Sequence, residues 1–241
     1  MVSKFNLGNV LSKNFKRIQR DKPRQIAFEV FSEVMRKDAY SNLILPQRLQ
    51  DKDLDPRDRA FVTELVYGAI RQTGRNDFII SKFVDRDWIS VDPGIVDVLR
   101  LGAYQLFDMR VPSHAAVDAT VNLARAVIGE SKASFVNAIM RKLSSRDLPD
   151  HLAEVQDDSV SSLSIRFSHP EWIINAYRDF ISNIDELKSL LNANNTPVAP
   201  TLVAWPGKST RSELEALGCT PTKFSPYGAI SNSPPFENPL I

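Results

Sequence analysis

Residues 92–143 decide the fold, and they read DPGIVDVLRLGAYQLF (92–107), VPSHAAVDATVNLARAVIG (111–129) and KASFVNAIMRKL (132–143). Asp92 can cap a helix whose first position is Pro93, a residue that needs no N–H there. In each segment the apolar residues recur at spacings of three and four, the pattern of a helix that buries one face. Three consecutive amphipathic helices are therefore expected.

The second and third segments also carry end signals and a polar face. Ser113 is expected to cap the second helix, and Gly129 can adopt the left-handed conformation that would end it. In the third segment, Asn137 and Arg141 lie four residues apart and therefore share one side of the helix. The other side is the expected core stripe: Val136, Ile139, Met140 and Leu143.

The residues before this stretch predict further helices of the same bundle. Pro23 suits the first turn of a helix, and Asp55 followed by Pro56 predicts another helix start. A short helix is expected over 43–49, and Asn76 is expected to cap the next one. No strand-like alternation occurs before residue 150, so residues 23–147 are predicted to form an all-α bundle.

The pattern changes after the bundle. Residues 148–167 are polar and rich in serine, which predicts a linker with one weak helical piece near Leu152. Ser168 and Glu171 have the spacing of a capping box, and another helix is expected from Asp185. Strands are predicted at 201–205 and 227–230, with a helix capped by Thr210 and ended by Gly218 between them. The predicted fold class is mainly α: a helical bundle followed by a small, incomplete α/β subdomain in residues 168–241.

Composition limits the kind of protein. The chain has 241 residues, of which 43% are hydrophobic and 24% charged, enough for one core and a smaller second unit. No apolar run approaches the length of a membrane helix and no secretory signal begins the chain, so a cytoplasmic protein without membrane contact is expected. The chain has only one cysteine and three histidines, so a structural zinc cluster is not expected.

Positive charge is concentrated at one end. The net charge is only +1, but residues 1–24 contain seven lysines and arginines against Asp21 alone, a local charge of +6. Residues 1–22 are therefore interpreted as a basic, flexible arm that meets a polyanion. A solvated disordered tail and a mitochondrial presequence are the alternatives that the same composition allows.

Five segments of the bundle resemble one protein family. They are DAYSNL (38–43), DRAFVTELVYG (58–68), LRLGAYQL (99–106), VPSHAAV (111–117) and FVNAIMR (135–141). They resemble the helical domain of the antitermination factor NusB and, more closely, the N-terminal region of the bacterial ribosomal RNA cytosine-5 methyltransferases of the RsmB/Sun type. HPEW (169–172) and NNTP (194–197) resemble the continuation of those methyltransferases, which free-standing NusB lacks. The resemblance covers the chain from about Pro23 onward and implies an RNA-binding bundle in residues 23–147.

The chemistry of those methyltransferases is not expected within this chain. The resemblance implies a further domain that binds S-adenosylmethionine through a glycine-rich turn and uses two cysteines, in Pro-Cys and Thr-Cys contexts. Cys219 follows Gly218 and matches neither context, and no G-x-G-x-x-G motif occurs. The chain is therefore expected to stop before that domain and to hold no catalytic, cofactor-binding or metal-binding residues of its own.

Other reactive side chains have plainer interpretations. Cys219 is interpreted as a small, buried hydrophobic residue. His114 follows the expected cap, where capping or packing is favoured over contact with a phosphate. His169 is expected to be structural, and Asp157 with Asp158 is expected to be solvated.

The expected RNA contacts fall in two places. The basic arm would contact phosphates through its densest cluster: Lys16, Arg17, Arg20, Lys22 and Arg24. Asn137 and Arg141 would read RNA shape or sequence or, alternatively, hold a neighbouring loop by a hydrogen bond.

These observations lead to a function hypothesis and two alternatives. The leading hypothesis is the RNA-binding front part of a 16S ribosomal RNA cytosine-5 methyltransferase, with small-subunit ribosomal RNA as its partner. The first alternative is a NusB-like antitermination factor that binds RNA and a protein partner. The second is a module that dimerises, or binds another protein, through its helical faces.

Overall fold

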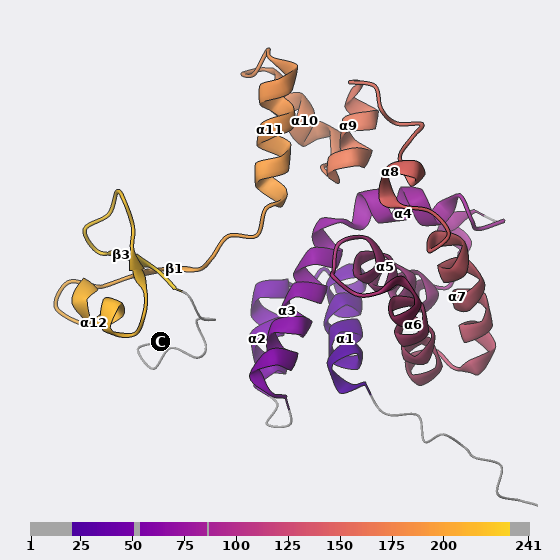
Figure 1. The fold of residues 1–241 in the computed structure, drawn as a ribbon, viewed down its shortest axis with the longest axis horizontal. Coiled ribbons are helices and arrows are strands. Elements are labelled where there is room, and N and C mark those ends of the chain that lie inside the picture. Colours follow the sequence, from indigo (N-terminus) through magenta and orange to yellow (C-terminus); the bar gives the residue numbers. More distant parts are fainter. Residues whose placement is uncertain (1–20, 51–53, 86, 232–241) are drawn as a thin grey trace, which may run out of the picture.

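A computed structural model of the chain describes residues 21–50, 54–85 and 87–231. Within these ranges the first part is a helical bundle, as the sequence predicts (Figure 1). Its helices are α1 (Lys22–Lys37), α2 (Ser41–Leu49), α3 (Pro56–Arg71), α4 (Thr73–Ser81), α5 (Pro93–Phe107), α6 (Ser113–Val127) and α7 (Glu130–Leu143). A single 3-10 turn, η1 (Trp88–Ser90), lies between α4 and α5.

Aspartate caps fix where three of these helices begin. Asp92 accepts a hydrogen bond from the backbone N–H of Gly94 at 2.9 Å, and Asp55 accepts one from that of Asp58 at 2.7 Å. These contacts satisfy N–H groups that have no partner inside the helix, so both predicted starts are confirmed. Asp21 caps α1 in the same way, through the backbone N–H of Arg24.

Two predicted caps are wrong. Asn76 lies inside α4 and is fully buried, because the helix already begins three residues earlier, at Thr73. Ser113 is the first residue of α6 rather than its cap, a position taken by Pro112 without a capping side chain. The fixed backbone angle of Pro112 sets the chain for the helix in place of a hydroxyl group.

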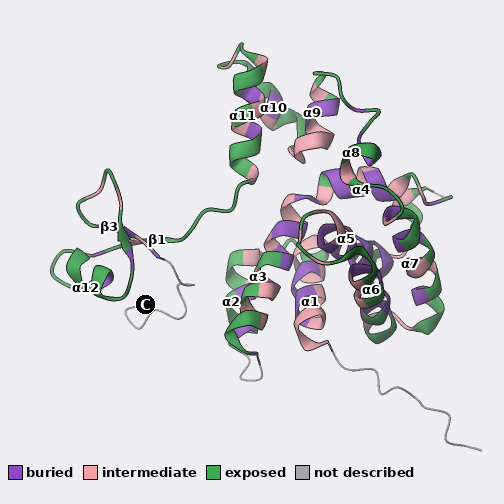
Figure 2. Cartoon of the chain, viewed as in Figure 1, coloured by how far each residue is buried: buried purple, intermediate pink, exposed green. Residues whose placement is uncertain are grey.

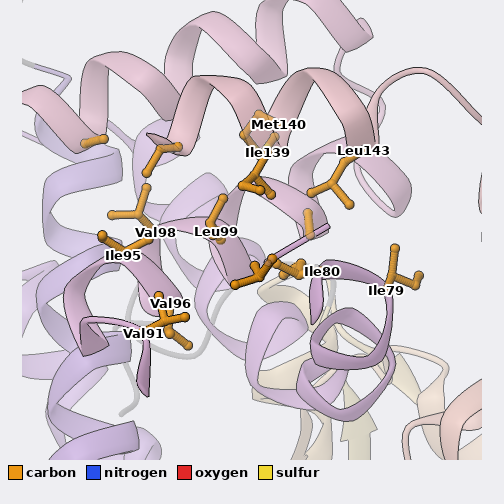
Figure 3. Packing of buried hydrophobic residues seen from close by; sticks show 14 of the residues in the cluster. Ile79, Ile80, Val91, Ile95, Val96, Val98, Leu99, Ile139, Met140 and Leu143 are labelled. Carbon is orange, nitrogen blue, oxygen red and sulfur yellow. The ribbon is translucent and has the colours of Figure 1, made fainter. Parts of the chain in front are cut away.

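Helix α5 is the centre of the bundle. It packs against α1, α3, α4, α6 and α7, and it belongs to both large hydrophobic clusters. Figure 3 shows Leu99 of α5 between Met140 of α7 and Ile80 of α4, with Val98 beside Ile95. Gly102 lets α6 and α7 approach closely, because a Cβ atom there would lie 2.6 Å from Thr120 Cγ2 and 2.8 Å from Met140 Sδ.

A carboxylate is buried in this core. Asp97 of α5 is 2% exposed and accepts hydrogen bonds from Arg36 Nε at 2.9 Å and from Ser32 Oγ at 2.8 Å. Arg36 Nη2 adds an ion pair at 2.6 Å. A buried carboxylate is tolerated when donors surround it, so these contacts fix α1 against α5.

The segment predicted as a linker with one weak helical piece near Leu152 contains two short helices. Residues 148–167 include α8 (Leu148–His151) and α9 (Val160–Phe167), and α9 packs against α10 (Glu171–Arg178) and α11 (Ile184–Asn195). Leu163, Ile174, Leu187 and Leu191 form their shared core. Helix α9 is difficult to predict from its serine-rich sequence, because Ser159 is its cap and Leu163 is its one fully buried apolar residue.

Ser168 also departs from its predicted role. It ends α9 in a left-handed conformation (φ 54°), and α10 begins after Pro170 without a capping side chain. The predicted capping box of Ser168 and Glu171 is therefore wrong.

The last described part, called here the sheet unit (residues 201–231), matches its prediction closely. It contains β1 (Thr201–Val203), α12 (Arg211–Ala216), β2 (Thr220–Pro221) and β3 (Gly228–Ile230), with β3 antiparallel to both neighbours in the order β1-β3-β2. Thr210 and Glu213 form the predicted capping box, and Gly218 takes a positive φ of 83° just after the helix. Strand β2 was not predicted.

Burial divides the chain unevenly. Figure 2 shows buried residues concentrated within the bundle, whereas few residues of α9–α11 and of the sheet unit are buried. Among the described residues, no helix combines the length and apolar character needed to cross a membrane.

Candidate nucleic-acid interface

The basic arm reaches the described part of the chain only at its end. Lys16, Arg17 and Arg20 lie outside the described residues, so their contacts with RNA stay a prediction. Lys22 and Arg24 are in the first turn of α1, where Lys22 is half-buried.

Arg24 is held inside the bundle rather than presented to solvent. Its Nε donates to Gln105 Oε1 at 2.6 Å, and its Nη1 lies 2.6 Å from Asp21 Oδ2. The guanidinium group also stands 4.6 Å above the ring of Phe61, a cation–π contact. Because the side chain is only 17% exposed, its clearest role is to fix the start of α1 against α3 and α5.

A pocket of about 330 Å³ lies beside this anchor, between the first turns of α1 and α3. Its lining includes Arg57, which is exposed and has no side-chain partner among the described residues. It also includes three carboxylates: Asp21, Asp55 and Asp58. The opposing charges make the pocket a poor site for a phosphate by itself.

The second predicted contact lies on α7. Asn137 is half-buried, Arg141 is exposed, and neither side chain makes a hydrogen bond or ion pair within the described ranges. The alternative in which they hold a neighbouring loop therefore has no contact to support it there.

Two further basic residues extend this surface. Lys142 and Arg146 follow Arg141, are exposed, and likewise have no side-chain partner among the described residues. We call Asn137, Arg141, Lys142 and Arg146 the α7 patch. Lys142 and Arg146 were not predicted from the sequence, although basic residues at a helix C-terminus are a recognisable signal because they face the negative end of the helix dipole.

Several other described basic side chains of the bundle are neutralised by carboxylates. The pairs are Arg36 with Asp97, Arg48 with Glu29 and Glu33, Arg75 with Asp108, Arg100 with Asp77, Arg125 with Glu130, and Lys132 with Asp92. The contact with Lys132, followed by backbone N–H groups, lowers the pKa of Asp92. Among the described residues of the bundle, Lys37, Arg57 and Arg110 are also exposed and unpaired, but they lie apart in the sequence, whereas the α7 patch has three such cations within residues 141–146.

The two motifs beyond the bundle lie near a seam, where the α9–α11 unit meets the end of α3 and the start of α4. Asn195 Nδ2 donates to the carbonyl oxygen of Phe167 at 2.7 Å, and the carbonyl oxygen of Asn195 accepts from Arg71 Nη1 at 3.0 Å. Ser168 Oγ accepts the backbone N–H of Arg75 at 3.3 Å, which caps α4 from another element. Asn195 of NNTP and Ser168, the residue just before HPEW, thus dock α9–α11 on the bundle, although they are separated in sequence (Figure 1).

The remaining candidate residues behave as structural or solvated groups. His169 Nδ1 lies 2.7 Å from the carbonyl oxygen of Phe167, in the seam, and Cys219 is buried at 7% exposure. His114 is exposed in the first turn of α6. Asp158 is exposed and pairs with Lys188 at 2.8 Å, and the described ranges hold no cluster of three metal-ligating side chains.

The sequence of this chain matches a known protein family and several named relatives. The NusB family profile matches residues 21–145. A Mycobacterium tuberculosis protein with the name "Putative methyltransferase Rv1407" is 37% identical over 213 residues, which cover 86% of this chain and 47% of that protein. The Bacillus subtilis protein named "Probable ribosomal RNA small subunit methyltransferase B" is 29% identical over 192 residues, or 79% of this chain and 42% of that protein.

The chain thus spans about half the length of the curated relatives it matches. The crystal structure of PH0851 superposes with a TM-score of 0.62 at 13% identity and covers 90% of this chain and 50% of that chain. At this level of identity the likeness is one of fold.

Proposed function

Since the chain belongs to the NusB family, we propose that its bundle binds RNA and forms the RNA-holding front part of a small-subunit ribosomal RNA cytosine-5 methyltransferase. One observation carries this proposal. The 213-residue alignment with the mycobacterial relative is longer than the NusB match to residues 21–145, so it includes residues beyond the bundle. A free-standing NusB-like factor has no need of the docked α9–α11 unit or the sheet unit.

The α7 patch is the proposed contact surface of the bundle. Arg141, Lys142 and Arg146 offer exposed positive charge that no described carboxylate neutralises. Phosphate contacts supply affinity and orientation, while groups such as the Asn137 amide can distinguish RNA features. The basic arm, which includes Lys22, would add phosphate contacts before and at the start of the first helix of the bundle.

The described residues do not fit S-adenosylmethionine. Cys219 is buried against Leu214 rather than presented to a substrate. The turn after β1 contains Gly207 with a positive φ, but a Cβ atom there would meet nothing within 4 Å, so this glycine does not mark a closely fitted cradle. In the proposal, the bundle holds RNA, and the methyl donor is bound by a domain outside the described residues.

The alternative is a NusB-like factor that binds RNA together with a protein partner. It is favoured by the family match itself, which covers the bundle and ends at residue 145. Both functions predict RNA binding, but they differ in whether residues 146–241 matter for it.

RNA binding can be tested with two charge-matched triple variants of the full chain. Replacing Arg141, Lys142 and Arg146 with glutamine removes three free cations of the α7 patch, whereas replacing Lys37, Arg110 and Arg178 removes three exposed, unpaired cations elsewhere. Fluorescence anisotropy with small-subunit ribosomal RNA hairpins would measure the affinity across a range of salt concentrations.

We expect the first variant to bind more weakly and to lose up to about 2 from the slope of log affinity against log salt, since each single-strand phosphate contact contributes roughly 0.7. The second variant should lose little. Equal losses in both variants would show non-specific attraction, and an unchanged affinity in the first would remove the α7 patch from the function.

A further inference from the structure

The sheet unit exposes aromatic side chains that its own core does not use. Trp205 is 69% exposed, Phe224 89% and Tyr227 50%, and each lies in a turn next to a strand. The core of the unit consists instead of Ala204, Leu214, Cys219 and Ala229, with Leu202 packed against it. The large rings are therefore not part of the packing that holds the strands together.

Strand pairing brings the two aromatic turns to one end of the sheet. Val203, the last residue of β1, pairs with Gly228, the first residue of β3, and the N–H of Ala204 donates to the carbonyl oxygen of Tyr227 at 2.9 Å. On the other side of β3, the N–H of Thr222 donates to the carbonyl oxygen of Gly228 at 3.0 Å. The turns that follow β1 and β2 are thus joined to the same end of β3.

Local hydrogen bonds give both turns a defined shape. The N–H of Lys208 donates to the carbonyl oxygen of Trp205 at 2.9 Å, and Trp205 N–H donates to Ser209 Oγ at 3.1 Å. In the second turn, Thr222 Oγ1 donates to the carbonyl oxygen of Ser225 at 3.2 Å. Rings on preordered turns lose less conformational freedom when they bind a ligand.

The charge at this end is positive only. Residues 196–210 and 217–231 contain Lys208 and Lys223 and no aspartate or glutamate. Both lysines are exposed, and Lys223 Nζ lies 5.1 Å from the centre of the Phe224 ring. The acids of this unit are on α12, where Glu215 pairs with Arg211 at 2.8 Å.

We propose that Trp205, Lys208, Lys223, Phe224 and Tyr227, called here the aromatic end, bind single-stranded RNA. Exposed rings stack on unpaired bases and nearby cations hold the phosphates, which is a general way of binding single strands without reading sequence. The positive charge of Lys208 and Lys223 complements a polyanion, and it argues against a neutral apolar partner. This proposal rests on the proposed RNA-binding function and adds a second surface, separate from the α7 patch.

The test uses the full chain and a labelled, unstructured 12-nucleotide RNA of mixed sequence. Trp205→Ala and Tyr227→Ala should each weaken binding between about fivefold and a hundredfold, the range for losing one base stack. The matched controls are Trp172→Ala and Phe180→Ala, which remove rings that are 71% and 89% exposed on or beside α10. Both controls should bind like the parent chain.

Salt and duplex measurements separate stacking from simple attraction. The double variant Lys208→Gln/Lys223→Gln should flatten the slope of log affinity against log salt by about 1.4. Pairing the probe with its complement should remove the sensitivity to Trp205→Ala, because the faces of paired bases are not available to the ring.

Cys219 provides an internal check that the sheet unit still folds. It is the only cysteine of the chain and is 7% exposed in the core of that unit, so it should react slowly with a thiol reagent in every folded variant.

Undiminished binding by Trp205→Ala and Tyr227→Ala would overturn the aromatic end as an RNA surface. Self-association of the parent chain that Trp205→Ala abolishes would also overturn it, in favour of a second copy as occupant. If binding depends on the α7 patch alone, only this inference fails; if no form binds RNA, the proposed function fails as well.

Discussion

The bundle and the sheet unit are built on cores of very different size. In the bundle, large side chains such as Phe31, Leu65, Leu99 and Met140 are fully buried, and each contributes about 1.5–3 kcal/mol by leaving water. In the sheet unit two of the four buried core residues are alanines, which bury little area. The comparison teaches that the bundle can hold its surface rigid by itself, whereas the sheet unit is the part that a bound partner would stabilise.

The largest effect should come from truncating the two cores. Leu99→Ala should lower the free energy of unfolding of the bundle by about 2–5 kcal/mol, because the cavity at the centre of α5 cannot close. Leu214→Ala should act locally and speed the reaction of Cys219 with a thiol reagent, while the bundle stays folded. Urea denaturation followed by circular dichroism would report the bundle, and thiol reactivity would report the sheet unit.

A shared transition would break the comparison. If Leu214→Ala lowers the midpoint of the bundle as much as Leu99→Ala does, the two parts unfold as one cooperative structure. Limited proteolysis gives a second view: cleavage should begin in the exposed segment 196–200 and leave residues 21–145 resistant.

The sequence predicted the parts whose signals are local. Asp92-Pro93 and Asp55-Pro56 mark helix starts because a carboxylate and the following residues are enough to form the cap. Gly218 and the capping box of Thr210 are equally local. Helix α9 was missed because its stability comes from packing Leu163 against α10 and α11, a contact that the serine-rich sequence does not show.

The candidate site was less predictable for the same reason. A basic residue reads alike in sequence whether it is free, as Arg141 is among the described residues, or taken up by the fold, as Arg24 is by Gln105 and Asp21. Only the partners across the fold distinguish the two. The free charge of the α7 patch therefore emerged only when the ion pairs of the other basic residues were known.

The second effect concerns the buried charge of the bundle. Asp97→Ala should cost about 2–4 kcal/mol in the free energy of unfolding, because Ser32 and Arg36 lose the carboxylate that they surround. Glu29→Ala is the control, since its pair with Arg48 is exposed and should contribute less than about 1 kcal/mol. Equal costs in chemical denaturation would show that burial of Asp97 does not matter.

A smaller effect is expected at the seam, the boundary between the rigid bundle and the rest. Ser168→Ala removes the oxygen that caps the backbone N–H of Arg75, and a lost cap typically costs about 1 kcal/mol. Hydrogen exchange should become faster in α9–α11 and in the first turn of α4, but not in α7. Ser145→Ala serves as the control, because its hydroxyl group bonds only within its own turn. Faster exchange throughout the bundle would mean that the seam belongs to the bundle's own cooperative unit.

The smallest effect is a pH dependence inside the bundle. Asp92 caps α5 and its Oδ2 lies 2.6 Å from Lys132 Nζ, and the lysine hydrogen bond is the main cause of its lowered pKa. A carboxyl group whose pKa is lower in the folded state stabilises the fold above the unfolded value of about 3.9, and that stabilisation is lost as the pH falls through the folded pKa. Lys132→Gln should therefore lower the free energy of unfolding by a few tenths of a kcal/mol at pH 7, since both side chains are about two-fifths exposed. At pH 2 it should lower that free energy by almost nothing.

Lys142→Gln is the matched control, because that lysine has no described acid partner and its small effect should not follow the Asp92 titration. Urea denaturation of the three proteins at pH 7, 5, 3 and 2 would measure this, and a cost for Lys132→Gln that stays constant over the series would show that the ion pair does not couple α5 to α7.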